Sequence, residues 1–152
     1  MELSQDFKEW LVCLNATKTE YVVVGGYALA HHGCPRNTGD LDVLVRPSSE
    51  NACRVLDALR AFGFGSLNIT QEDLNREGRV IQLGFPPQRI DILTSIDGVD
   101  WETASASPSI ATIDGITTPF ISVASFLLNK RATGRLRDIA DAEDLERKLD
   151  RA

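Results

Sequence analysis

The stretch Tyr21–Val45, YVVVGGYALAHHGCPRNTGDLDVLV, contains two apolar runs separated by a polar segment. The first run ends at Gly25-Gly26, and the second opens with the tripeptide DLD at positions 40–42. Because successive side chains alternate along a strand, Asp40 and Asp42 leave the same face, about 6 to 7 Å apart. Burying such charges without a partner is costly, and a divalent cation bound by carboxylates and a phosphate compensates for it. The pair therefore indicates a cation site.

A third acid, Asp91, lies between Ile90 and Ile92 in the apolar run RIDIL. Adjacent strands lie about 4.8 Å apart, so three carboxylates converge if this strand neighbours the one that carries Asp40 and Asp42. Such a site can hold two divalent ions roughly 3.5 to 4 Å apart, which clamp the attacking and leaving oxygens in phosphoryl and nucleotidyl transfer. We therefore predict that the three acids are metal ligands and catalytic residues.

The glycine pair Gly25-Gly26 favours a phosphate site beside these acids. Glycine lets the backbone approach a ligand closely, and a following helix presents free N–H groups and the positive end of its dipole. Lys130 continues an apolar helical stripe, so it either extends its charge to the surface or reaches an anion. We predict a phosphate contact. Arg36 and Thr38, just before the acids, either order that loop or contact the nucleotide.

Hydrophobic periodicity and turn residues predict an α+β fold with a central mixed β-sheet flanked by helices. Asp114-Gly115 and the segment 86–88 each predict a tight connection between antiparallel strands. No element is assigned to residues 63–78, and Trp101 is placed in a loop. The predicted helices are Glu2–Asn15, Tyr27–His32, Ser48–Phe62, Ser122–Gly134 and Arg135–Leu149, and the predicted strands are Tyr21–Val24, Leu41–Val45, Val80–Phe85, Ile90–Leu93, Ile110–Ile113 and Ile116–Pro119.

The composition is that of one soluble domain covering residues 1–152, with 43% hydrophobic and 25% charged residues. A net charge of -6 argues against broad electrostatic binding of DNA. The three cysteines have no C-x-x-C spacing, and the sequence shows neither a signal peptide nor an apolar run of the length that spans a bilayer. We therefore expect a cytoplasmic protein without membrane attachment.

These motifs resemble those of the polymerase-β-like nucleotidyltransferases, specifically the minimal bacterial and the abortive-infection or toxin–antitoxin members. The resemblance rests on Gly25-Gly26, the later D-x-D and the single Asp91. It extends through the stretches His32–Asp42, HGCPRNTGDLD, and Lys130–Asp141, KRATGRLRDIAD. Together these stretches cover most of the chain, and the resemblance implies the polymerase-β-like nucleotidyltransferase fold.

By this resemblance, Asp40 and Asp42 bind Mg²⁺ or Mn²⁺ and the triphosphate, whereas Asp91 binds a second ion and helps to activate the acceptor hydroxyl. Gly25-Gly26 would hold the phosphates, although the family often has Gly-Ser at these positions. The implied reaction transfers NMP from an NTP, ATP foremost, to a hydroxyl of a protein, an RNA or a small molecule. The implied partner is the second chain of a toxin–antitoxin pair.

Other interpretations remain open at this point. A D-x-D motif alone more often serves turns and helix caps, and the basic run from Lys130 to Arg137 is also typical of a solvated helix junction. We expect one packed and one solvated side chain for His31 and His32, which are adjacent on a helix. The alternative function is a non-catalytic, antitoxin-like binding protein on the same fold that retains the carboxylates for nucleotide or metal.

Overall fold

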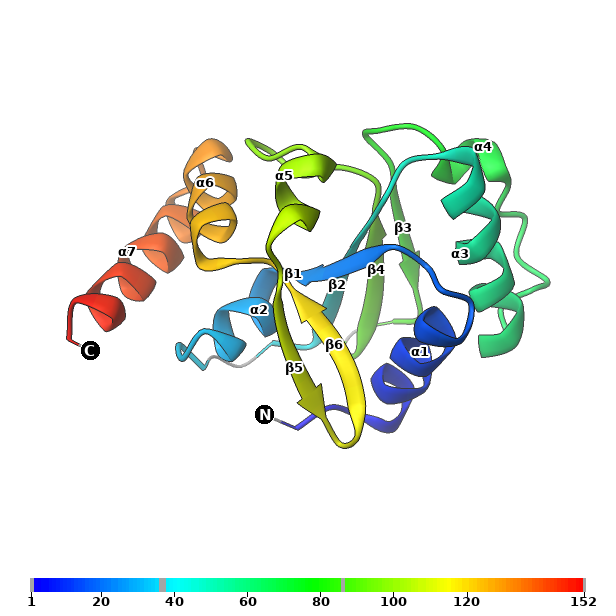
Figure 1. The fold of residues 1–152 in the computed structure, drawn as a ribbon, viewed down its shortest axis with the longest axis horizontal. Coiled ribbons are helices and arrows are strands. Elements are labelled where there is room, and N and C mark those ends of the chain that lie inside the picture. Colours follow the sequence, from blue (N-terminus) through cyan, green and yellow to red (C-terminus); the bar gives the residue numbers. More distant parts are fainter. Residues whose placement is uncertain (1, 36–37, 86, 152) are drawn as a thin grey trace.

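The computed structural model describes residues 2–35, 38–85 and 87–151. Within these residues seven helices surround a six-stranded sheet. Figure 1 shows α6 and α7 on one side of the sheet and α1, α3 and α4 on the other. The helices are α1 (Gln5–Ala16), α2 (Gly25–His31), α3 (Ser49–Phe62), α4 (Gln71–Leu74), α5 (Trp101–Ala106), α6 (Val123–Ala132) and α7 (Leu136–Asp150). The strands are β1 (Tyr21–Val24), β2 (Asp40–Val45), β3 (Val80–Leu83), β4 (Arg89–Leu93), β5 (Ser109–Ile113) and β6 (Ile116–Phe120).

The sheet has the strand order β3-β4-β2-β1-β6-β5 and is mixed. β2 is antiparallel to β1 but parallel to β4, and β6 is parallel to β1. The β3–β4 and β5–β6 pairs are the two predicted antiparallel hairpins. The predicted α+β class, a mixed central sheet flanked by helices, is therefore confirmed.

The turn of the second hairpin has the predicted form. Asp114 and Gly115 both adopt positive φ, 50° and 81°, as a type I′ turn requires. The turn of the first hairpin includes Pro86, which lies outside the described residues.

The main core lies between the sheet and the helix pair α1–α3. Phe7, Trp10, Leu11 and Leu14 form the buried stripe of α1, at the spacing that one face of a helix requires. Central β1 is buried along its whole length. Among the described buried side-chain polar atoms, the Trp10 indole nitrogen is the one without a hydrogen-bond partner.

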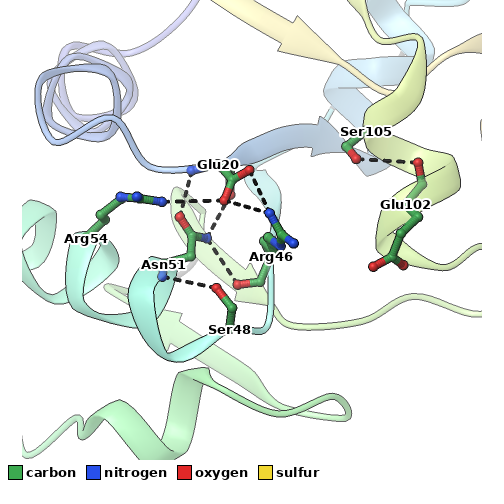
Figure 2. A network of polar contacts seen from close by, with 7 residues as sticks. All are labelled: Glu20, Arg46, Ser48, Asn51, Arg54, Glu102 and Ser105. Atoms are coloured by element: carbon green, nitrogen blue, oxygen red, sulfur yellow. Dashed lines mark hydrogen bonds and ion pairs between the residues drawn. The ribbon is translucent and has the colours of Figure 1, made fainter.

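Buried Asn51 joins the start of α3 to the ends of β1 and β2 (Figure 2). Its amide oxygen accepts from the Glu20 N–H at 2.8 Å, and its amide nitrogen donates to the carbonyl oxygens of Glu20 and Arg46 at 3.0 and 3.1 Å. Ser48 caps the helix by accepting from the Asn51 N–H. Backbone groups at the end of the sheet remote from Asp40 are thereby satisfied.

Two predictions about the helices were wrong in detail, and a further helix lies in the region to which no element was assigned. The first helix begins at Gln5 because the Ser4 hydroxyl caps it, rather than at Glu2. The unassigned region contains α4, which has a capping box formed by Thr70 and Asp73. The expected loop at Trp101 is the helix α5, capped by Asp100. Both missed helices are too short to show a helical period, and only their capping residues mark them.

No helix in the described part of the chain is long and apolar enough to span a membrane.

Candidate active site

The parallel pairing of β2 with β4 brings the three predicted acids together. Asp42 is the register partner of Asp91, and Asp40 is the partner of Arg89. Asp42 also faces Val24, the last residue of β1. Since Asp40 and Asp42 are two residues apart on β2, all three carboxylates lie on one face of the sheet. Asp91 is buried, with 7% of its surface exposed.

Arg89 binds two of these acids, and sequence reasoning missed it. Its Nε donates to Asp91 Oδ1 at 2.8 Å, and its Nη2 lies 3.1 Å from both Asp91 Oδ2 and Asp40 Oδ2. The signal was present in the sequence, because Arg89 is two residues before Asp91 and therefore shares its face. One guanidinium thus joins acids from adjacent strands and partly neutralises the cluster.

The third acid, Asp42, has a strongly raised pKa of about 7. Burial is the largest cause, followed by the charge of Asp91 and a hydrogen bond with it, and then by the charge of Asp40. The nearby Lys130 acts in the opposite direction. Apposed carboxylates raise a pKa because both cannot be ionised cheaply at short range. The cluster therefore takes up positive charge readily, as a proton or as a cation.

Gly25 lies against the Asp42 carboxylate at the start of α2. Its φ is +70°, and a Cβ at this position would overlap Asp42 Oδ2. Gly26 is in close contact with Thr38, because a Cβ there would lie 2.9 Å from the Thr38 hydroxyl oxygen. Both glycines are thus required by close packing within the protein, and their predicted role in holding phosphates stays a prediction. Thr38 itself packs beside Gly26, whereas Arg36 lies outside the described residues.

Lys130 lies between the acid-bearing face and the last helix. Its ammonium is 3.2 Å from Asp138 Oδ1 and 3.7 Å from Asp141 Oδ2, and 14% of its side chain is exposed. It also lies over the Phe126 ring, 5.5 Å from the centroid. Burial would raise the pKa of Asp138, but the Thr133 hydrogen bond and Lys130 outweigh it and lower that pKa. Lys130 therefore has two acidic partners within the protein.

A cavity of about 430 Å³ connects these groups. Gly25 and Asp42 line it on the sheet side, and Lys130 and Asp138 line it from the α6–α7 hairpin. Asp40, Asp91, Gly26 and Thr38 are not part of its lining. The predicted residues thus form two adjoining groups, an acid cluster held by Arg89 and a cavity that reaches Lys130.

The prediction that one of the two histidines is packed and the other solvated was wrong, because both are packed. His31 stacks on the Phe120 ring at a centroid distance of 4.1 Å and shares a hydrogen bond with the Ser109 hydroxyl. His32 is bonded through Nε2 to the carbonyl oxygen of Ile121. Both are half-buried because the C-terminal part of β6 and its extension at Ile121 run beside α2.

Tyr27 packs edge-on against Phe7. Burial raises the pKa of its hydroxyl, and the charge of Asp40 raises it further.

The donor atoms of the acid cluster fit a divalent cation in chemical type, because hard cations prefer carboxylate oxygens. Among the described residues, however, no group of three His, Cys, Asp or Glu side chains is arranged to hold a metal ion. Arg89 binds oxygens of Asp40 and Asp91 that a metal would need. The apposed pair of Asp42 and Asp91 nevertheless has the excess negative charge that a cation relieves. The residues therefore fit the ion, provided that Arg89 gives up part of its contacts.

Comparison by sequence finds no matching protein family and no matching curated protein. Among solved structures, a match is the crystal structure of a "putative nucleotidyltransferase (TM1012)" from Thermotoga maritima. It aligns with a TM-score of 0.59 and 18% sequence identity over 96% of this chain and 91% of that chain. This chain has a nucleotidyltransferase-like fold. That part of the family resemblance is confirmed, and the narrower bacterial subtype stays a prediction.

Proposed function

We propose that residues 1–152 form one cytoplasmic nucleotidyltransferase domain that transfers NMP from an NTP, ATP foremost, to a hydroxyl group. The observation that carries this proposal is the apposition of Asp42 and Asp91, with Asp40 beside them, on a nucleotidyltransferase-like fold. The cavity that extends from Asp42 to Lys130 leaves room for an anionic ligand next to these acids. Acids and adjoining cations of this kind are what phosphoryl chemistry uses.

In this proposal Asp40, Asp42 and Asp91 hold Mg²⁺ or Mn²⁺. The bound ion supplies charge neutralisation at the phosphates and favours deprotonation of the attacking hydroxyl. Gly25 and Gly26 allow the backbone to approach the triphosphate, and Lys130 offsets its charge from the opposite wall. Asp91 orients the acceptor hydroxyl and accepts its proton as the oxygen attacks. The new bond joins this oxygen to the α-phosphorus, the bond to the bridging oxygen breaks, and pyrophosphate leaves.

The acceptor is a protein, an RNA or a small molecule, and we place the enzyme in a toxin–antitoxin or abortive-infection pair. The test incubates the protein with each α-labelled NTP, Mg²⁺ and a cell lysate, with and without the product of the neighbouring gene. We expect label on one class of acceptor for the wild type. Asp91→Asn should lower the rate by about 10² or more while retaining most NTP affinity. Asp57→Asn, which changes an exposed acid paired with Arg60, is the matched control.

A second candidate function is a non-catalytic, antitoxin-like binding protein. Arg89 favours it, because a guanidinium that joins Asp40 and Asp91 already supplies the cluster with a cation. The label-transfer experiment described above also distinguishes the two proposed functions. Absence of label on every lysate component, in the presence and in the absence of the partner chain, would leave the binding protein as the function.

A further inference from the structure

The cavity beside Asp42 is lined by cations from two separate walls. Lys130 and Arg135 come from the α6–α7 hairpin, and Arg79 comes from the residue before β3. Arg79 and Arg135 are both exposed. Of the acid cluster, Asp42 lines the sheet side of the same cavity, so a ligand bound there would meet this carboxylate as well as the arginines.

Lys130 alone does not make this cavity cationic. It is paired with Asp138 and Asp141, so its positive charge faces two carboxylates of the protein. A phosphate that approaches only Lys130 would also meet these two acids at short range. A polyphosphate therefore needs further positive charge, and Arg79 and Arg135 are the residues that the cavity offers.

The backbone holds both arginines in place although their side chains are exposed. The Arg79 N–H donates to the Thr94 hydroxyl at 2.9 Å, and its carbonyl oxygen accepts from the Thr94 N–H at 3.0 Å. The Arg135 N–H donates to the Thr133 hydroxyl at 3.2 Å. The Arg135 guanidinium is 3.8 Å from Asp138 and 76% exposed, so its side chain can turn to a ligand at small cost.

We propose that Arg79 and Arg135 bind the β- and γ-phosphates of the nucleoside triphosphate, and the pyrophosphate that it releases, from the two elements that bring them to this cavity. The inference rests on the proposed nucleotidyl transfer and names the residues that recognise the leaving group. Guanidinium groups suit this role because their planar donors bind phosphate oxygens in pairs. Two clamping arginines also offset the charge that develops on pyrophosphate as its bond breaks.

The chain contains a matched control for each arginine. Arg76 is exposed like Arg79. The pKa of Asp73 is lowered chiefly by the hydrogen bonds between Asp73 and Thr70, and the charges of both arginines lower it further. Arg76 does not belong to the cavity lining. Arg137 is likewise exposed, lies in the first turn of α7 two residues after the N-cap Arg135, and is absent from that lining.

The test is isothermal titration of the full chain with ATP, AMP and inorganic pyrophosphate, each with Mg²⁺. We expect Arg79→Gln and Arg135→Gln each to weaken ATP and pyrophosphate binding by about tenfold, with AMP affinity unchanged. Arg76→Gln and Arg137→Gln should leave all three affinities within about twofold of the wild type. Thermal unfolding of each variant checks that the fold is intact.

Two results would overturn the inference while the proposed function stands. One is ATP affinity that falls no more in Arg79→Gln and Arg135→Gln than in the controls, and the other is an equal loss for AMP. Wild-type protein that binds neither ATP nor pyrophosphate would instead remove the proposed function and this inference together.

Discussion

Asp42 lies directly opposite Asp91 in the parallel pairing of β2 and β4. Two carboxylates therefore occupy neighbouring positions on the central strands, where burial and mutual repulsion raise the pKa of Asp42 to about 7. A protein gains no stability from such a pair, and strongly perturbed carboxyl groups of this kind are typical of functional sites.

The first prediction concerns the pH dependence of stability. Below pH 3.8, the ordinary value, Asp42 is protonated in the folded and the unfolded chain. Between this value and pH 7 the unfolded chain releases the proton first, so the free energy of unfolding falls as the pH rises. Asp42→Asn removes this loss and should stabilise the metal-free protein at pH 8 by up to about 4 kcal/mol. Urea unfolding at pH 3.5 and pH 8, with Asp57→Asn as control, measures it. A shift of equal size at both pH values would contradict the prediction.

Arg89→Gln should expose the repulsion within the acid cluster. The variant keeps a hydrogen-bonding side chain but removes the charge that joins Asp40 to Asp91. We expect a lower free energy of unfolding at pH 8, and added Mn²⁺ should restore more stability to the variant than to the wild type. Arg46→Gln is the control, because Arg46 pairs with Glu20 at the far end of β2. Equal effects of Mn²⁺ on both variants would show that Arg89 does not compete with a cation.

Gly25→Ala tests the close approach of the backbone to Asp42. Gly25 and Gly63 both have positive φ, but open space surrounds Gly63. Gly63→Ala should therefore cost only the strain of a left-handed residue, about 1 to 2 kcal/mol. Gly25→Ala adds the overlap with the Asp42 carboxylate, so it should destabilise the protein more and also weaken ATP binding. Unfolding and ATP titrations of both variants measure the difference, and equal losses would refute it.

The elements that were predicted correctly are those with a strong local signal. Val22 and Val23 in β1 belong to a continuous β-branched run, the buried stripe of α1 has the helical period, and Asp114-Gly115 favours a tight turn between strands. The sequence also placed Asp40, Asp42 and Asp91 on strands and indicated that the three carboxylates converge if these strands are neighbours. It had no means of showing that β2 and β4 are parallel, because that pairing depends on the path of the chain between them.

Contacts made by long, flexible side chains were the least predictable. Arg89 and Asp40 are far apart in sequence, and their contact follows only from the register of β2 against β4. The sequence also presents Lys130 as a cation on an apolar stripe, without any sign that α7 turns back and places Asp138 and Asp141 beside it. Tertiary packing decides such pairs, and local patterns do not encode it.

Asp138 and Asp141 modify the expected effect of replacing Lys130. Lys130→Met keeps the apolar stem and removes the charge, so ATP binding should weaken by roughly 1.5 to 3 kcal/mol. The fold should also lose stability, because Lys130 helps to lower the pKa of Asp138. A lowered carboxyl pKa stabilises the protein above the unfolded value, and this contribution is lost as the pH falls. The destabilisation should therefore be larger at pH 7 than at pH 3, and Lys148→Met is the control. A loss of stability without any loss of ATP affinity would assign Lys130 to packing.

Asn51→Ala tests a part of the fold that is separate from the site. The amide makes three hydrogen bonds to the backbone of Glu20 and Arg46, so its loss leaves backbone groups without partners. We expect a loss of roughly 2 to 4 kcal/mol in urea unfolding and no change in ATP affinity. Asn75→Ala, which removes one contact of 3.4 Å, should have a much smaller effect. A change in ATP affinity would show that the two ends of the sheet are coupled.

The parallel pairing of β2 with β4 also determines when, during folding, the carboxylates meet. Parallel neighbours cannot be joined by a tight turn, and here the connecting chain passes through α3, α4 and β3. We therefore expect a partly folded state with β1 and β2 paired to contain Asp40 and Asp42 without the repulsion from Asp91, since long-range closures are slow. During synthesis the cluster cannot form until Leu93, the last residue of β4, has left the ribosome. The electrostatic cost of the site thus falls on a step that follows the pairing of β1 with β2.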